Sequence, residues 1–347
     1  MLCNITNELI CNLKESELTK EEKDFLKDIW YYYVEGIIGL TIAIIGFIMN
    51  TVTTYILRTK SDLKQITNYL VSSLLIINNI FLVTKVINIL VYGFRYNSLL
   101  VIIPYLVYPV EKTSLTAMVF CTVCLAHQVY LITLNPQKFK KISSSMESRR
   151  KRTMHYMLPV TILATIINLP RWFTYYIEFD GEDNKFKKIA NDALKKNFHY
   201  AVFYENFVLN ILTVFASIAL LVFFNMSVFY FIREKQREII HERTNLQHSS
   251  PNAVNEIKES NTKIKFNTKA HILIIIIFLF IICHFPRCFL KFYDGFYKSF
   301  AIDLLQSIER TLTIIHASVP PFVYLLKNGA FRGHLLELWK TIRMCKS

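Results

Sequence analysis

Charged side chains occur inside stretches of this sequence that are otherwise strongly apolar. Glu111 and Lys112 are adjacent in one such stretch, and Arg310 lies in another. An ionised group in an apolar environment is costly unless it pairs with an opposite charge or serves a ligand. These stretches hold no cluster of His and Asp suited to a metal, and no nucleophile beside a base. The pattern therefore predicts binding rather than catalysis, with no metal and no cofactor.

The candidate ligand-binding residues are mostly cationic or aromatic and lie toward one end of the apolar segments. An arginine-rich rim suits a ligand that carries a carboxylate or another anion. We expect an extracellular peptide or small molecule, bound in a pocket between helices. The candidates are Glu111, Lys112, Arg171, Trp172, Tyr204, His284, Arg287 and Arg310.

Two alternative interpretations of these charges involve no ligand. Glu111 and Arg310 could form an internal ion pair that only holds helices together. Arg287 could extend its side chain to the membrane surface instead of contacting a ligand.

The elements that must position these residues are seven apolar segments. At about 1.5 Å per residue, each is long enough to cross a hydrocarbon core of about 30 Å as a helix. The 53% hydrophobic content is unusual for a soluble domain. We therefore expect an all-α membrane protein with a seven-transmembrane helix bundle over residues 34–326. Its segments are 34–57, 67–92, 98–132, 154–176, 202–232, 268–292 and 301–326.

The net charge of +14 is distributed by loop and does not indicate nucleic-acid binding. More than half of the 40 Lys and Arg residues lie in the first, third and fifth connections and in the C-terminal tail, whereas residues 1–33 are rich in acids. Basic loops favour the cytoplasmic side. We expect a multi-pass plasma-membrane protein with residues 1–33 extracellular and residues 327–347 on the cytoplasmic side.

Both ends of the chain carry candidate modification sites. Asn4 begins a glycosylation sequon on the expected outer side. Residues 330–343 place apolar side chains near one face at helical spacing, which predicts a helix lying on the inner leaflet. Cys345 follows this helix and is a candidate for palmitoylation.

Short motifs recur along the segments in a fixed order. The motifs are Gly46 with Asn50-Thr51-Val52, Thr67-Asn68-Tyr69-Leu70, Gln128-Val129-Tyr130 before Asn135-Pro136, Phe280-x-x-Cys283-His284-Phe285-Pro286, and Pro320-Pro321-Phe322-Val323-Tyr324 before Phe331-Arg332. Together they resemble the rhodopsin-like G-protein-coupled receptors over residues 34–343.

The resemblance implies a set of switch and transducer residues, several of which are substituted here. Gln128 and Val129 replace the family's acid and arginine, Asn78 replaces its second-segment acid, and His284 replaces its tryptophan. Pro286 and Pro321 each remove a backbone hydrogen bond and can let a helix pivot. The implied set is Asn50, Asn78, Gln128, Val129, Tyr130, Phe280, Pro286, Pro321 and Tyr324.

Finer motifs favour one branch of this family. Tyr108-Pro109 and the run from Leu169 to Phe173 are similar to invertebrate FMRFamide-type peptide receptors and equally to the nematode serpentine chemoreceptor class W. The resemblance implies a receptor that detects a neuropeptide or chemosensory small molecule and signals to a heterotrimeric G protein.

Other classes of membrane protein remain as alternatives. A seven-helix ligand-gated channel subunit would insert with its N-terminus inside. A non-signalling membrane scaffold would explain why Gln128 and Val129 stand where the family has its acid and arginine. A transporter would usually show repeats or broken, glycine-rich helices, and neither is visible.

Overall fold

The computed structural model describes residues 19–60, 63, 66–93, 106–135, 146–173, 175–179, 186–190, 197, 199–246, 274–286, 290 and 300–344. This part of the chain is almost entirely helical, with one two-stranded hairpin. The first rod consists of α2 (Lys20–Trp30), the π-helix η1 (Tyr31–Gly39) and α3 (Leu40–Thr59), which follow one another without a break. Helices α4 (Ile66–Gly93) and α5 (Tyr108–Leu134) come next.

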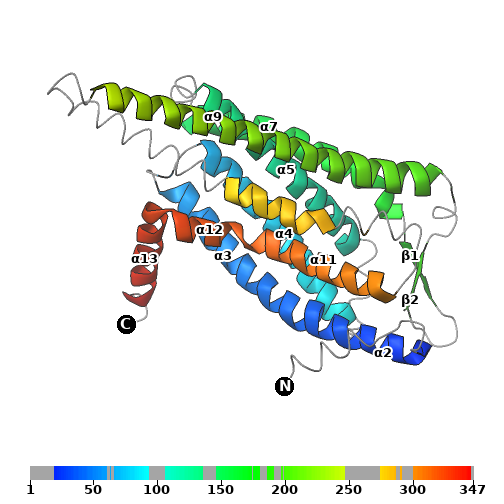
Figure 1. The fold of residues 1–347 in the computed structure, drawn as a ribbon. Helices are drawn as coiled ribbons and strands as arrows, with labels where there is room; N and C mark the ends of the chain where they lie inside the picture. Colours follow the sequence, from blue (N-terminus) through cyan, green and yellow to red (C-terminus); the bar gives the residue numbers. More distant parts are fainter. Residues whose placement is uncertain are drawn as a thin grey trace.

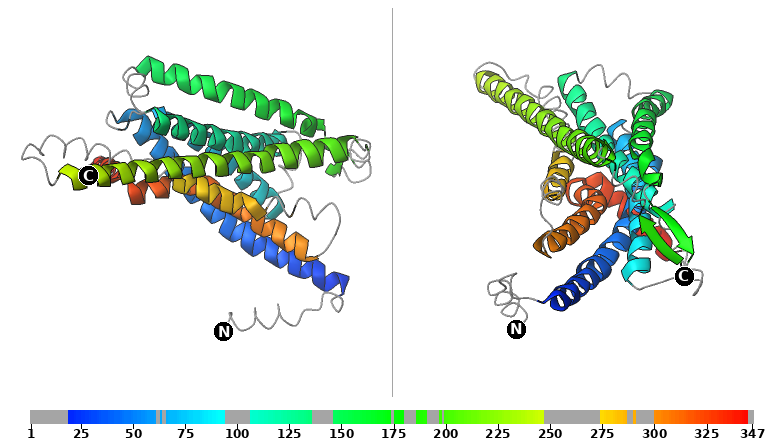
Figure 2. Two further views of the ribbon diagram at one scale, coloured as in Figure 1. Left: turned by 45° about the horizontal axis from the view of Figure 1, so that its top comes forward. Right: turned by 90° about the vertical axis from the view of Figure 1, so that its right-hand side faces the viewer.

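The second half of the chain adds further helices and the hairpin. Helix α7 (Met146–Asn168) ends in a 3-10 helix, η5 (Leu169–Phe173), before strands β1 (Tyr175–Phe179) and β2 (Phe186–Ala190). The π-helix η6 (His199–Phe215) continues into α9 (Ala216–Leu246) as one long rod (Figure 2). The remaining helices are Ile274–Pro286, α11 (Phe300–Ser318), α12 (Pro320–Lys327) and α13 (Gly329–Met344).

Four helices in the described part are long and apolar enough to cross a membrane, which makes a membrane location plausible. They are Asp28–Thr59, Thr67–Val91, Tyr108–Leu134 and Phe207–Lys235. The apolar helix Ile274–Pro286 is shorter. Helix α7 has a basic first half, and α11 carries Asp303, Glu309 and Arg310, so neither has the length of uncharged sequence that the other four have. Four of the seven expected spans are therefore found by length and composition.

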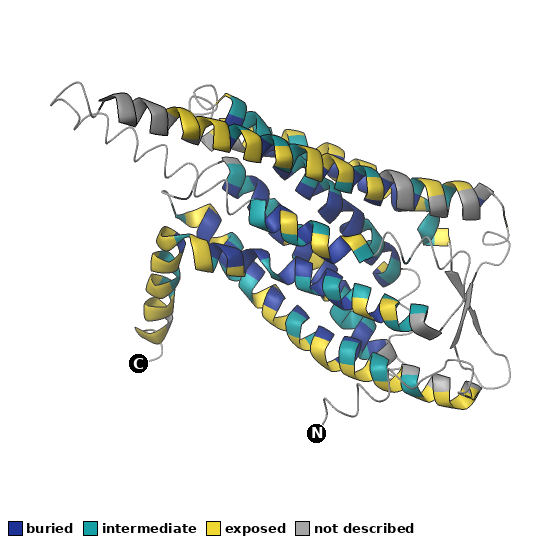
Figure 3. Cartoon of the chain, in the orientation of Figure 1, coloured by how far each residue is buried: buried dark blue, intermediate teal, exposed yellow. Residues whose placement is uncertain are grey.

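The long helices lie side by side around a shared core (Figure 1). Helix α5 is central, since it packs against α4, α7 and α9, while α11 packs against α3 and η1. The interior holds fully buried side chains such as Phe81, Met118 and Leu125. Many residues on the outside of the helices are exposed (Figure 3). Large apolar residues such as Ile48 and Ile166 are among the exposed ones. An apolar exterior of this kind suits a lipid environment.

The first helix begins earlier than the sequence analysis expected. It starts at Lys20, so the last part of residues 1–33, which were expected to precede the first membrane segment, is helical. The reason is a capping box. The Thr19 hydroxyl accepts a hydrogen bond from the Glu22 backbone N–H at 3.3 Å, and the Glu22 carboxylate accepts one from the Thr19 N–H at 2.9 Å. These contacts hold the pKa of Glu22 below its usual range.

Other boundaries also differ from the expected segments. Helix α7 begins at Met146 and its α-helical part ends at Asn168, so the whole element lies earlier than 154–176. The hairpin was not predicted, although its register places Glu178 opposite Lys187. The last expected segment is divided at Val319, because Pro320 and Pro321 cannot continue the hydrogen bonding of α11.

Helix α13 is the amphipathic element expected after the last segment, and it turns away from α12 (Figure 1). Phe331 is fully buried and its ring lies 5.9 Å from that of Tyr324. On the other side Leu336 and Trp339 are exposed, and the Arg343 guanidinium lies 5.4 Å from the Trp339 ring centre. This distribution suits a helix at a membrane surface. Cys345 and Asn4 lie outside the described residues.

Acidic pH should loosen the contact between α13 and α3. The Glu337 carboxylate accepts a hydrogen bond from Lys60 Nζ at 3.0 Å and lies 3.2 Å from His334 Nδ1. These contacts hold the pKa of Glu337 below its usual range. A carboxyl with a lowered pKa stabilises the fold above its unfolded pKa, and this contribution is lost as pH falls through the folded value. We expect faster hydrogen exchange in residues 329–344 as pH falls below about 4.5, after correction for intrinsic rates.

The variant Lys60→Gln provides the control for this pH effect. It should raise the hydrogen-exchange rate of residues 329–344 at neutral pH. It should also reduce the difference in exchange rate between neutral pH and a pH below about 4.5. Because both side chains are exposed, the change should be modest. Equal protection of α13 at both pH values in the unmodified protein would contradict the assignment.

Candidate functional site

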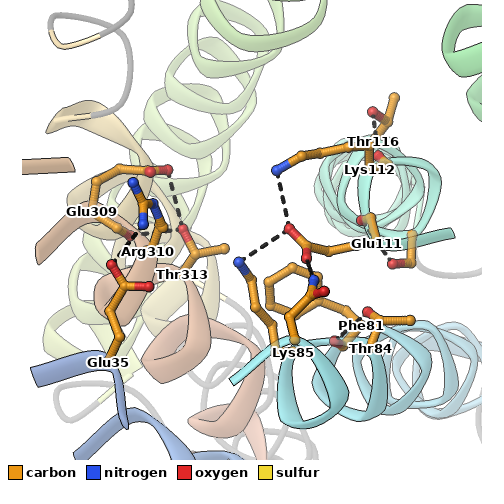
Figure 4. Close-up of polar contacts among 12 residues, drawn as sticks. Glu35, Phe81, Thr84, Lys85, Glu111, Lys112, Thr116, Glu309, Arg310 and Thr313 are labelled. Carbon is orange, nitrogen blue, oxygen red and sulfur yellow. Dashed lines mark hydrogen bonds and ion pairs between the residues drawn. The ribbon is translucent and has the colours of Figure 1, made fainter. Parts of the chain in front are cut away.

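A cavity of about 180 Å³ lies between α4, α5, η5 and α11, in the half of the bundle that carries the hairpin. Its wall includes an apolar part, formed in particular by Phe81, Leu115 and Leu290. The rest of the wall is rich in charge. Figure 4 shows two groups of charged side chains facing each other, one around Glu111 and one around Arg310.

The first group is centred on Glu111, whose side chain is 3% exposed. Its Oε1 atom lies 3.0 Å from both Lys85 Nζ and Lys112 Nζ, and its Oε2 atom accepts a hydrogen bond from Asn88. Two ammonium groups therefore share one buried carboxylate. This group joins α4 to α5, because Lys85 and Asn88 belong to α4.

Both lysines also lie over aromatic rings. Lys112 Nζ is 5.1 Å from the centre of the Tyr108 ring, and Lys85 Nζ is 5.7 Å from that of Phe81. A ring face attracts a cation through its quadrupole. The rings therefore help to hold both ammonium groups at the cavity wall.

The second group joins α11 to the first helix. Arg310 Nη1 lies 2.8 Å from Glu35 Oε1, and the Glu35 side chain is 7% exposed. One turn of α11 also brings the Thr313 hydroxyl within hydrogen-bonding distance of Glu309, since it donates to the Glu309 carbonyl at 2.9 Å. Glu35 lies in η1, so the π-helical turn brings a buried acid to the back of the cavity wall.

The structure brings half of the predicted ligand-binding residues together. Glu111, Lys112, Arg171 and Arg310 all line the cavity. Tyr204 lies elsewhere, and its hydroxyl donates to the Ile167 carbonyl at 2.8 Å. The remaining predicted residues do not line the cavity in the described part: Trp172 is half-buried, His284 lies in the core, and Arg287 is outside the described residues.

The suggested ion pair between Glu111 and Arg310 is wrong. Each residue has a different partner, because Lys85 and Lys112 reach Glu111 while Glu35 reaches Arg310. Lys112 follows Glu111 directly on the helix, where neighbouring side chains diverge by roughly 100°. Its flexible four-carbon chain instead folds back to the carboxylate.

Sequence reasoning missed three polar residues of these two groups: Lys85, Asn88 and Glu35. Lys85 is the only charged residue of the expected segment 67–92, so the rule that selected Glu111 would also have selected it. Glu35 stood at the edge of the first expected segment. The sequence carries no comparable signal for Asn88.

The residues implied to be switches gather deeper in the bundle. Asn50 of α3 and Asn78 of α4 both donate to the Ala317 carbonyl of α11, at 3.0 and 3.1 Å. The Tyr324 hydroxyl of α12 donates to Asn68 Oδ1 of α4 at 3.0 Å. These bonds connect the consecutive helices α3 and α4 to α11 and α12, which lie 239 to 267 positions later in the sequence.

A buried aromatic cluster lies beside this region. The Phe280 ring centre is 4.3 Å from that of His284 and 4.9 Å from that of His316. His284 is therefore a core residue between helices. Pro286 is the last residue of the described helix Ile274–Pro286, and residues 287–289 lie outside the described residues. The prolines of the last segment do divide its helix, as noted above.

Gln128, Val129 and Tyr130 were expected to belong to a transducer surface, but they are less exposed than such a surface requires. Gln128 and Val129 are buried, and Val129 packs in the main hydrophobic core. Tyr130 is partly exposed, with its ring centre 5.6 Å from that of Phe224. It lines a shallow hollow with Met226 and Tyr230 of α9. Of the three residues, only Tyr130 contributes exposed surface.

The described residues hold no group of three or more His, Cys, Asp or Glu side chains placed to bind a metal ion. Fold and site together define a largely helical protein with candidate membrane helices and a charged cavity between them. No protein-family model matches this sequence, and no curated protein does either.

Proposed function

We propose that this protein is a seven-helix receptor of the rhodopsin-like type in the plasma membrane. It binds an extracellular ligand in the cavity and signals to a heterotrimeric G protein. The observation that carries the proposal is the shared Ala317 carbonyl, which joins Asn50 and Asn78 to the last segment. Asn50 and Asn78 are also two of the positions that the resemblance implies to be switch residues. The sequence motifs and the observed contacts therefore support the same alignment of the helices along one another.

The cavity supports the ligand-binding half of the proposal. It contains charges that are costly inside a bilayer and so have a functional or structural reason. Its wall is built from four elements, so a ligand that contacts several of them can favour one arrangement of helices over another. In this proposal α7, Ile274–Pro286 and α11 with α12 complete the seven spans. The hairpin end lies outside the cell and α13 lies on the inner leaflet.

Membrane orientation is the first test. An N-terminal epitope tag should be detected on intact cells, and a C-terminal tag only after permeabilisation. The variant Gln306→Cys should react with a membrane-impermeant thiol reagent applied outside, relative to the parent protein, because Gln306 lines the cavity. The variant Lys340→Cys on α13 is the matched control and should react only from inside. An N-terminal tag found inside would favour the inverted channel subunit.

Signalling is the second test. Cells expressing the protein and a panel of G proteins should show ligand-dependent dissociation of Gα from Gβγ, measured by energy transfer. A ligand-gated current that persists when GDP-β-S blocks the G proteins would instead identify a channel. A correctly inserted protein that gives neither response to any ligand bound in the cavity would favour the scaffold.

A further inference from the structure

Positive charge exceeds negative charge around the cavity. Among the described residues its wall holds the cations Lys85, Lys112, Arg171 and Arg310 and the acids Glu111 and Glu309. Glu35, which pairs with Arg310 from behind, adds one more negative charge. One positive charge remains in excess when these seven groups are counted. A net charge in a partly enclosed cavity between helices calls for a counter-ion.

Arg171 carries this excess. It lies in η5, where α7 ends just before the hairpin, and its side chain is half-buried at the cavity wall. Among the described residues it forms no ion pair and no side-chain hydrogen bond. The other two cationic sites already hold carboxylates, Glu111 for the lysines and Glu35 for Arg310. A guanidinium presents a planar fork of donors that matches a carboxylate.

We propose that the cavity binds a small organic monoanion whose carboxylate pairs with Arg171 and Lys112. Its apolar body lies against Phe81, Leu115 and Leu290. This inference rests on the proposed function, because it names the chemical class of the ligand for that site. The carboxylate supplies the missing negative charge, and the apolar part of the wall gives an aryl or alkyl body a surface to contact.

Size and charge narrow the ligand further. A cavity of about 150 Å³ is known to hold one benzene molecule, and this cavity measures about 180 Å³. A ligand of about six to ten non-hydrogen atoms therefore fits, whereas a peptide of several residues does not. A phosphate ester carries about −1.5 to −2 charges at pH 7, which exceeds the single charge to be neutralised. A carboxylate is the better match.

Thermal unfolding of the purified full-length protein in detergent tests this inference without requiring a signal. The probes are benzoate, phenylacetate and hexanoate, each compared with its neutral amide at the same concentration. The carboxylates should raise the melting temperature in a saturable way, and the amides should not. Arg171→Gln should weaken carboxylate binding at least about tenfold, because a charged hydrogen-bond partner is lost.

Three further variants separate the site from general effects of charge. Arg150→Gln is the matched control, since Arg150 is an exposed arginine at the opposite end of α7, and it should leave carboxylate binding unchanged. Arg171→Lys should retain part of the affinity, because it keeps the charge but loses the fork. Lys112→Gln provides a second site for the same test if Arg171→Gln lowers the yield of folded protein.

Several outcomes would overturn the inference. They are equal stabilisation by acids and amides, stabilisation by amines instead, equal effects of Arg171→Gln and Arg150→Gln, or no stabilisation by any of the carboxylates up to 10 mM. Binding only by N-acetylated tripeptide acids would overturn the size argument. Carboxylate binding without G-protein activation would leave this inference standing and count against the proposed function. G-protein activation by neutral ligands that is unchanged by Arg171→Gln would support the proposed function and overturn this inference.

Discussion

Replacing Glu111 by glutamine should destabilise the protein by about 3 kcal/mol or more. The substitution keeps the size of the side chain but leaves Lys85 and Lys112 without their shared carboxylate. Their side chains are only 12% and 22% exposed, so water replaces the lost partner poorly. Thermal unfolding in detergent, together with the fraction of protein that reaches the cell surface, measures the loss.

Two matched variants identify the cause of that loss. Glu147→Gln removes an acid whose ion pair with Lys151 is exposed on both sides, and it should cost less than about 1 kcal/mol. Lys85→Met combined with Glu111→Gln should recover much of the stability, because one buried cation leaves together with the carboxylate. A Glu111→Gln protein as stable as Glu147→Gln would show that the buried group contributes little. The double variant measures the coupling directly.

Replacing Gly46 by alanine should have the second large effect. A Cβ atom at Gly46 would lie 2.0 Å from Ser318 Oγ, 2.5 Å from Ser318 Cβ and 3.1 Å from Ser318 Cα. The last contact involves backbone, so rotating a side chain cannot relieve it. Helices α3 and α11 must separate, which stretches the hydrogen bond from Asn50 to Ala317. We expect a loss of about 2–3 kcal/mol in the free energy of unfolding.

A second glycine supplies the control for this prediction. Gly333 of α13 has no atom within 4 Å of a Cβ built there, so Gly333→Ala should be neutral or stabilising by about 0.5–1 kcal/mol through helix propensity. Adding Ser318→Gly to Gly46→Ala removes the two closest atoms and should recover part of the loss. Equal melting temperatures for Gly46→Ala and Gly333→Ala would contradict the close packing of the two helices.

Much of the helical layout could be predicted, because apolar runs of membrane length fold as helices whatever surrounds them. The second segment, expected over 67–92, is found as Ile66–Gly93. The first boundary was missed because the capping pair at Thr19 and Glu22 is a local polar signal outside the apolar run. The hairpin after η5 depends on pairing across a turn, and its composition is not that of an apolar strand.

The cavity was only partly predictable. The cost of a buried charge selected Glu111, Lys112 and Arg310 correctly as residues near one site. The cost of burying a charge does not predict which oppositely charged residue will pair with each of these side chains. His284 was assigned to the ligand by its place in a motif, yet its ring packs against Phe280 and His316 in the core. A motif position gives the depth of a residue along a helix but not the direction in which the side chain points.

The sequence by itself determined that this chain is largely helical, that several helices suit a membrane, and which charges would be costly there. These properties are local, since each depends on a run of neighbouring residues. Only the tertiary structure decided the partners, because Arg310 meets Glu35 across 275 positions of sequence and Asn50 meets Ala317 across 267. Contacts over such distances depend on how helices pack. The packing leaves Arg171 at the cavity without a carboxylate in the described part of the chain.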